Sequence, residues 1–146
     1  METKLTRKVF YSLSLRLFHP SINPDDITTL LTLNPDHAWK AGDQIKTPAG
    51  DLFNGVREQT YWCRSTYTED NYFSAEINDL ISYLAPHRDS LHRIKKEGGR
   101  TEIYLGLPGS INTGDTLPLE TLTKLVDLKV ELSIEIFPQM KRQQLS

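Results

Sequence analysis

This chain of 146 residues contains a single cysteine, Cys63, so no disulfide can form within it. It also lacks any run of about 18 consecutive apolar residues, the length that a membrane-spanning helix needs. The apolar stretch at 9–18 is interrupted by polar residues at alternate positions and has no small-residue cleavage site after it, so it is typical of a strand rather than a signal peptide. These absences predict a cytoplasmic protein that does not enter the membrane.

Patterns for metal binding and nucleophilic catalysis are missing as well. No two of the four histidines have a spacing that places them on one face of a helix. Cys63 lies in a predicted strand without a base near it in the sequence, and the loop at 106–114 lacks the glycine spacing of a phosphate-binding loop. We therefore expect no metal, no cofactor and no catalytic residue, and we expect the protein not to be an enzyme.

Apolar residues alternate with polar ones in several segments, and this predicts strands at 9–18, 51–53, 59–67, 102–107 and 130–136. Helical spacing of apolar residues predicts a short helix capped by Asn23, a helix up to Leu84 with a second piece at 88–97, and a helix at 119–127. The prediction is one α+β domain over residues 1–146, in the order β-α-β-β-α-β-α-β. Clean alternation favours a single antiparallel or mixed sheet with helices packed on one face.

A short internal similarity leaves two interpretations open. Residues 21–23 and 110–112 both read Ser-Ile-Asn, each after a predicted strand, and Asp26 and Asp115 follow at equal distance. The first interpretation is a duplicated, ferredoxin-like arrangement of strand-loop-helix units. The second is chance similarity of three residues.

The charge is distributed unevenly along the chain. The net charge is −2, but residues 19–80 contain ten Asp and Glu against four Lys and Arg, which gives this segment a net charge of −6. Nucleic-acid-binding domains carry a basic surface instead, so we expect no nucleic-acid partner.

Two tryptophans and two charged residues form the most unusual group in the sequence: Trp39, Asp43, Arg57 and Trp62. In a structural interpretation, both rings cover the open side of the sheet and Asp43 pairs with Arg57. In a functional interpretation, the four side chains surround a shallow pocket for a ligand or for a side chain of a partner.

These residues also belong to a family pattern. The segment 12–17 (Ser-Leu-Ser-Leu-Arg-Leu), the run 38–43 (Ala-Trp-Lys-Ala-Gly-Asp) and Trp62 resemble a bacterial family of small proteins known only as a domain of unknown function. The resemblance extends over nearly the whole chain, and the run 38–43 is its most specific part. It implies a single-domain bacterial protein and carries no activity with it.

Our leading hypothesis is a protein-binding module, specifically a bacterial immunity protein that neutralises a toxin. Nuclease toxins have basic active sites, and an acidic surface would associate with them rapidly and in a salt-dependent way. On this hypothesis the partner-binding residues are acids of the negative segment: Asp25, Asp26, Asp36, Asp43 and Asp51. The oligomeric state stays open, and so does the alternative that these acids only keep the surface soluble.

The alternative function is a small-ligand-binding protein or an enzyme. It would use the candidate pocket of Trp39, Asp43, Arg57 and Trp62, with His37 as a base near neutral pH. An ion pair between Asp43 and Arg57 under both rings, with no cavity beside it, would exclude this alternative.

Overall fold

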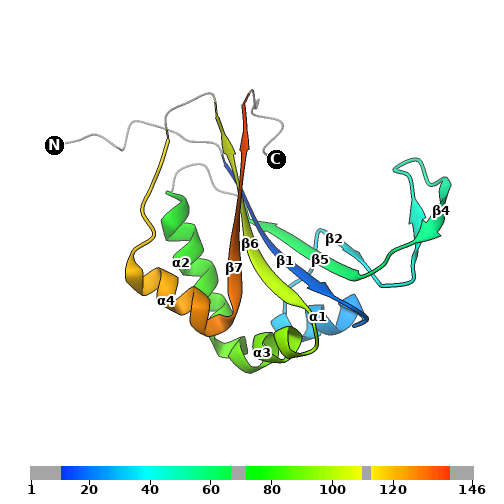
Figure 1. Ribbon diagram of the computed structural model, residues 1–146, viewed down its shortest axis with the longest axis horizontal. Coiled ribbons are helices and arrows are strands. Elements are labelled where there is room, and N and C mark those ends of the chain that lie inside the picture. Colours follow the sequence, from blue (N-terminus) through cyan, green and yellow to red (C-terminus); the bar gives the residue numbers. More distant parts are fainter. Residues whose placement is uncertain (1–10, 67–71, 110–112, 139–146) are drawn as a thin grey trace.

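A twisted mixed sheet, with helices on one face and a hairpin projecting beside it, forms the fold of the computed structural model, which describes residues 11–66, 72–109 and 113–138 (Figure 1). The elements follow in this order: β1 (Ser12–His19), α1 (Pro24–Leu31), β2 (His37–Trp39), β3 (Gln44–Lys46), β4 (Leu52–Val56), β5 (Thr60–Thr66), α2 (Phe73–Leu84), the 3-10 turn η2 (Ala85–His87), α3 (Arg88–Lys96), β6 (Arg100–Pro108), α4 (Leu119–Leu128) and β7 (Val130–Phe137). Among the described helices the longest, α2, has 12 residues, and none combines the length and the hydrophobicity of a membrane span.

The main sheet has the strand order β2-β5-β1-β6-β7, which places β1 in its centre. Neighbouring strands are antiparallel except for β6 and β7, which are parallel and joined through α4. The strands β3 and β4 form a separate antiparallel hairpin. This arrangement confirms the predicted α+β class with a mixed sheet.

The core lies between the sheet and the helices. Leu13, Leu15 and Leu17 of β1 are buried and point to the helix side, as the alternation predicts. Each helix contributes an apolar face to the same cluster, including Ile27 and Leu31 of α1, Ile77 and Leu84 of α2, Leu91 and Ile94 of α3, and Leu125 and Leu128 of α4. Within residues 11–66, 72–109 and 113–138, all the α-helices therefore cover one face of the sheet, and none covers the other, which we call the open face.

The first helix begins as the sequence predicts. The Asn23 side chain accepts a hydrogen bond from the Asp25 amide at 2.9 Å, and Pro24 occupies the first turn. Two carboxylates in that turn, Asp25 and Asp26, face the positive end of the helix dipole. The helix ends at Thr32, which has a left-handed φ of 56°.

The structure differs from the predictions in two respects: it has two strands that were not predicted, β2 and β3, and it lacks the ferredoxin-like duplication. The segment between α1 and β5 was expected to contain one short strand, yet it contains β2, β3 and β4. The ferredoxin-like duplication is not seen. In a duplication, β1-α1-β2 and β6-α4-β7 would be equivalent units, but β7 pairs in parallel with β6 whereas β2 pairs with β5 and not with β1. The second Ser-Ile-Asn copy, at 110–112, lies outside the described residues.

Candidate functional site

The open face of the sheet carries a row of three aromatic rings from three neighbouring strands. Tyr61 of β5 pairs across the strands with Phe18 of β1 and with Trp39 of β2, so all three side chains share this face. Ring centroids are 5.2 Å apart for Phe18 and Tyr61 and 4.7 Å apart for Trp39 and Tyr61. We call Phe18, Tyr61 and Trp39 the aromatic row.

Arginine side chains stack on both ends of this row. The guanidinium carbon of Arg57 lies 3.7 Å from the centre of the Trp39 ring, and that of Arg100 lies 3.9 Å from the centre of the Phe18 ring. Cation–π contacts of this kind contribute about 0.5–2 kcal/mol each, more where water is excluded. Stacking fixes the planes of both guanidinium groups, and the Arg100 guanidinium also donates to the Glu102 carboxylate at 2.7 Å.

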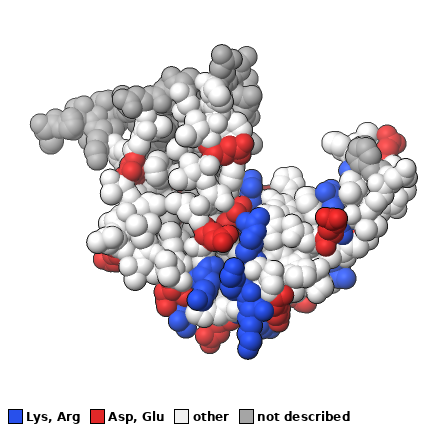
Figure 2. Space-filling view, in the orientation of Figure 1, with Lys and Arg blue, Asp and Glu red and all other residues white. Residues whose placement is uncertain are grey.

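A third stacked arginine extends the surface toward β7. Arg16 lies 3.7 Å above the Tyr104 ring. Both Arg16 and Arg100 also contact the carboxylate of Glu102, at 3.6 and 2.7 Å, and Glu102 is only 5% exposed. The Ser133 hydroxyl donates to the same carboxylate at 2.7 Å, so this buried charge is compensated. Figure 2 shows basic side chains in a line down the middle of the visible face, with acidic side chains beside them.

The phenols on this face keep their protons at neutral pH. Burial, together with the hydrogen bond to Glu135, raises the pKa of Tyr104 to about 12. Burial is also the main cause that raises the pKa of Tyr61. Both phenols are therefore uncharged near neutral pH, and neither is a base there; the Tyr104 ring carries the stacked Arg16 guanidinium.

A tight turn positions Arg57 at the base of the projecting hairpin. Gly42, with a φ of 93°, donates its amide to the Arg57 carbonyl at 2.8 Å, and the Arg57 amide donates to the Asp43 carbonyl at 2.7 Å. The Asp43 side chain closes the turn by accepting from the Lys40 amide at 2.8 Å. The run 38–43 thus connects β2 to the hairpin and holds Arg57 over Trp39.

A hollow of about 740 Å³, open to solvent, lies between the hairpin and the aromatic row. Figure 2 shows the hairpin projecting from the body of the protein. The lining of the hollow comprises Phe18, Pro20, Trp39, Ile45, Val56, Arg57, Glu58, Gln59 and Tyr61. A neighbouring hollow of about 560 Å³ is lined by Trp39, Asp43, Gln44, Lys46 and Arg57. The two hollows share Trp39 and Arg57, which therefore form the centre of the candidate site.

The structure brings three of the four predicted pocket residues together. Trp39, Asp43 and Arg57 line one hollow, whereas Trp62 lies on the opposite face, fully buried under α1. The expectation for Trp62 was wrong because Trp39 pairs with Tyr61, and consecutive residues of a strand point to opposite faces. Tyr61 takes the place in the site that Trp62 was expected to fill.

Asp43 and Arg57 are joined through their backbones, and their side chains form no ion pair with each other. Asp43 accepts from the Lys40 amide, and the Arg57 guanidinium lies on the Trp39 ring. A hollow lies beside them. The arrangement that would exclude the pocket alternative is therefore absent from this described region. His37 lies at the start of β2, exposed and two residues from Trp39 on the same strand.

The five acids predicted to bind a partner lie in separate parts of the molecule. Asp25 and Asp26 are exposed at the start of α1, and Asp51 precedes β4, where its amide donates to the Thr47 hydroxyl. Figure 1 shows that α1 and the hairpin of β4 lie in different parts of the molecule. Asp36 accepts from the Ser65 amide at 2.7 Å, and Asp43 closes its turn. Two of these carboxylates thus have structural hydrogen bonds, and only Asp43 lines a hollow beside the aromatic row.

Sequence reasoning missed most of the open face, which includes Phe18, Tyr61, Tyr104, Arg16 and Arg100. One signal was available: Arg16 and Phe18 alternate with the buried leucines of β1 and so must lie on the open side. Their partners come from β5 and β6, and cross-strand register decides those contacts.

The chain matches one known protein family over most of its length. The model of a domain of unknown function, DUF4279, matches residues 8–138. The chain belongs to the DUF4279 family. This match confirms the resemblance that the run 38–43 and the strand at 12–17 indicate. None of the curated proteins and none of the solved structures with which it was compared matches the chain.

Proposed function

We propose that this DUF4279 protein is a protein-binding module that receives its partner on the open sheet face, at the hollow beside Trp39 and Arg57. The stack of Arg57 on Trp39 at the edge of this hollow is the observation that supports the proposal best. Tryptophan, tyrosine and arginine are the residues that contribute most to binding energy at protein interfaces. Here all three lie within one surface and are held in place before a partner arrives.

The hairpin adds an apolar edge to this surface. Leu52 and Val56 of β4 are 59% and 55% exposed. Burying exposed apolar side chains of this size against a partner is favourable by about 25 cal/mol per Å². A partner that fills the hollow would contact the hairpin on one side and the aromatic row on the other.

Within this class, we propose the more specific function of a cytoplasmic immunity protein that neutralises a bacterial toxin. Glu58 lines the larger hollow and Asp43 the smaller one, so each hollow has one carboxylate beside the aromatic floor, together with Arg57. A basic side chain of a nuclease toxin could pair with such a carboxylate while its aliphatic part packs on the rings. The acids of α1 would then affect the rate of association more than the contact itself.

The test uses the gene next to that of this protein. Its product is expressed in a bacterial host, alone and together with the DUF4279 protein, and growth and co-purification are measured. We expect growth arrest without the protein, rescue with it, and loss of both rescue and co-purification with Trp39→Ala or Arg57→Ala. Lys124→Ala, on the exposed side of α4, is the matched control and should rescue fully. A harmless neighbour that does not co-purify would overturn the immunity function.

A small-ligand-binding function is the second candidate, and one observation favours it. The hollow lined by Trp39, Asp43 and Arg57 offers one acidic side chain, an aromatic wall and, with Lys46, two basic side chains, and a few polar groups beside an aromatic wall are a common composition of ligand sites. Ligand-observed NMR with a library of small aromatic acids and amines distinguishes the two functions. Binding lost in Trp39→Ala, together with no protein partner, would favour the ligand. The absence of any such binding would exclude it.

A further inference from the structure

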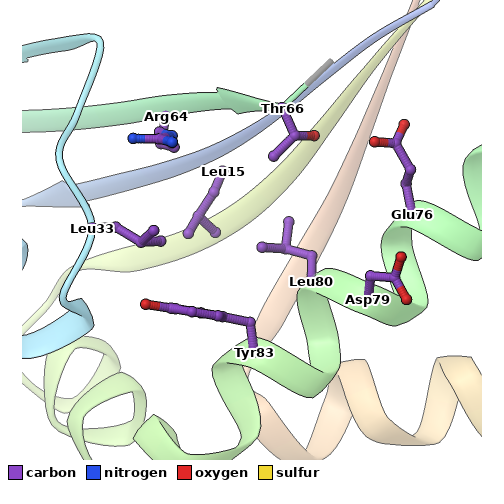
Figure 3. A pocket seen from close by; sticks show the side chains of 8 residues that line it. All are labelled: Leu15, Leu33, Arg64, Thr66, Glu76, Asp79, Leu80 and Tyr83. Atoms are coloured by element: carbon purple, nitrogen blue, oxygen red, sulfur yellow. The ribbon is translucent and has the colours of Figure 1, made fainter. Parts of the chain in front are cut away.

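A third and smaller cavity lies on the helix side of the sheet, away from the open face (Figure 3). It has a volume of about 230 Å³ and lies between α2, the strands β1 and β5, and the segment that follows α1. Its lining comprises Leu15, Leu33, Arg64, Thr66, Glu76, Asp79, Leu80 and Tyr83. We call it the α2 cavity.

The interior of the α2 cavity is apolar. Leu15 is fully buried at its base and Leu80 of α2 is nearly so, while Leu33 packs against the core from the other side. Apolar cavities of about 150 Å³ in proteins stay dry and bind benzene. The α2 cavity therefore has room for an aromatic ring with a short chain attached.

Hydrogen bonds hold its walls in place. The Tyr83 hydroxyl donates to the carbonyls of Leu31 and Thr32, at 2.7 and 3.2 Å, and so ties α2 to the end of α1. Arg64 donates to the Asn34 carbonyl at 2.8 Å. These bonds keep the neighbouring elements apart at a fixed spacing, so a ligand would enter a site that is already formed.

One side of the cavity is negatively charged. Glu76 and Asp79 are one turn apart on α2, and Figure 3 shows both carboxylates on the same side of the cavity, away from Arg64. Glu76 accepts a hydrogen bond from the Tyr11 hydroxyl. Among the described residues, neither carboxylate has a cationic partner. Burial raises the pKa of Glu76, with a further contribution from Asp79, so a bound cation would relieve an unfavourable charge.

We propose that the α2 cavity binds a small molecule that has an apolar body and a primary ammonium group. The body lies between Leu15, Leu80 and the Tyr83 ring, and the ammonium group lies between the Glu76 and Asp79 carboxylates. Hydrogen bonds between charged groups are about twice as strong as neutral ones, which gives selectivity for the amine over a neutral ligand of equal shape. The site is independent of the proposed protein-binding surface because the sheet separates the two.

Two probes of matched shape test this proposal: 2-phenylethylamine and 2-phenylethanol. Titration calorimetry measures their affinities, and NMR follows the methyl groups of Leu15, Leu33 and Leu80. We expect saturable binding of the amine, with shifts of those methyl signals, and at least about tenfold weaker binding of the alcohol. No saturable binding of the amine, or equal affinities for the two probes, would overturn the proposal.

Substitutions of the two carboxylates test where the ammonium group binds. Glu76→Gln and Asp79→Asn should each weaken binding of the amine, with little effect on the alcohol. Glu120→Gln, an exposed carboxylate on α4, is the matched control and should bind the amine as the wild type does. Leu33→Phe, which fills the cavity from its half-buried side, should abolish binding of both probes while the circular dichroism spectrum is unchanged. Amine binding that survives both carboxylate variants would contradict the assigned position.

Discussion

The indole nitrogen of Trp62 donates a hydrogen bond to the Thr28 hydroxyl at 3.0 Å, which links the centre of β5 to α1 across the core. The Trp62 ring is fully buried on the helix side, so water does not reach its N–H group in place of Thr28. This bond explains how a tryptophan can occupy the core without leaving a polar atom unsatisfied.

Removing the acceptor should therefore be costly. Thr28→Val keeps the shape of the side chain and leaves the buried Trp62 N–H without a partner, so we expect a loss of about 1–3 kcal/mol in unfolding free energy. Thr29→Val, at an exposed position of the same helix, should cost less than about 0.5 kcal/mol. Urea denaturation measures both. Equal losses would show that the Trp62 hydrogen bond does not contribute to stability.

The stack of Arg57 on Trp39 can be observed by fluorescence. The chain has two tryptophans, so Trp62→Phe leaves Trp39 as the only indole emitter. In that background, Arg57→Ala should expose the Trp39 ring to water and shift its emission to longer wavelength, with a loss of about 0.5–1 kcal/mol in stability. Arg64→Ala is the control, because Arg64 lines the cavity on the opposite face and should leave the emission of Trp39 unchanged.

The ionisation of Glu76 should make stability depend on pH. Burial raises the pKa of this carboxyl from its usual 4.5, the Tyr11 hydrogen bond lowers it, and Asp79 raises it again. A group with a raised pKa in the folded state stabilises that state while protonated, and this contribution is lost as the pH rises through the folded pKa. Glu76→Gln keeps an acceptor for Tyr11 and does not ionise.

The wild type should thus lose stability that Glu76→Gln keeps. The difference in melting temperature, Glu76→Gln minus wild type, should therefore increase as the pH rises from about 4 to 7. Thermal denaturation over this range tests the expectation, with Glu120→Gln as an exposed control that should show little pH-dependent difference. A Glu76→Gln difference that is constant with pH would contradict the direction of the pKa shift.

Gly99 should tolerate no side chain. A Cβ atom at this position would lie 2.5 Å from the Phe18 carbonyl oxygen and 2.9 Å from the Ile94 side chain, so β6 would have to move away from the end of β1. We expect Gly99→Ala to lower the unfolding free energy by about 1–3 kcal/mol or more. Gly114→Ala, where nothing lies within 4 Å of the new atom, should be nearly neutral. Chemical denaturation of the two variants provides the comparison.

The sequence was sufficient to predict elements whose periodicity reflects burial. The alternation in β1 and β6 records which side chains face the helices, and the apolar spacing from Phe73 to Leu84 matches α2 residue by residue. The alternation in β7 is less informative, because Ile134 and Ile136 are 57% and 63% exposed. In contrast, β2 and β3 have three residues each and lie at exposed positions, so their sequences show no period that could be detected. These strands form because neighbouring segments offer them hydrogen-bonding partners.

The candidate site was only partly predictable for a related reason. Trp39 and Arg57 could be associated because the turn at Gly42 and Asp43 suggests that the chain reverses between them. The contacts of Trp39 with Tyr61, and of Phe18 with Arg100, depend on the register of strands far apart in the sequence. That register follows from packing of the whole sheet, and no local pattern encodes it.

The central position of β1 also affects how the chain can fold. This strand is synthesised before both of its neighbours, and its partners β5 and β6 begin only at Thr60 and Arg100. Contacts between such distant segments require long loops to close first, which slows folding to about the millisecond-to-second range. Until then Leu13, Leu15 and Leu17 remain in water, so a nascent chain should depend on chaperones until β6 has been made.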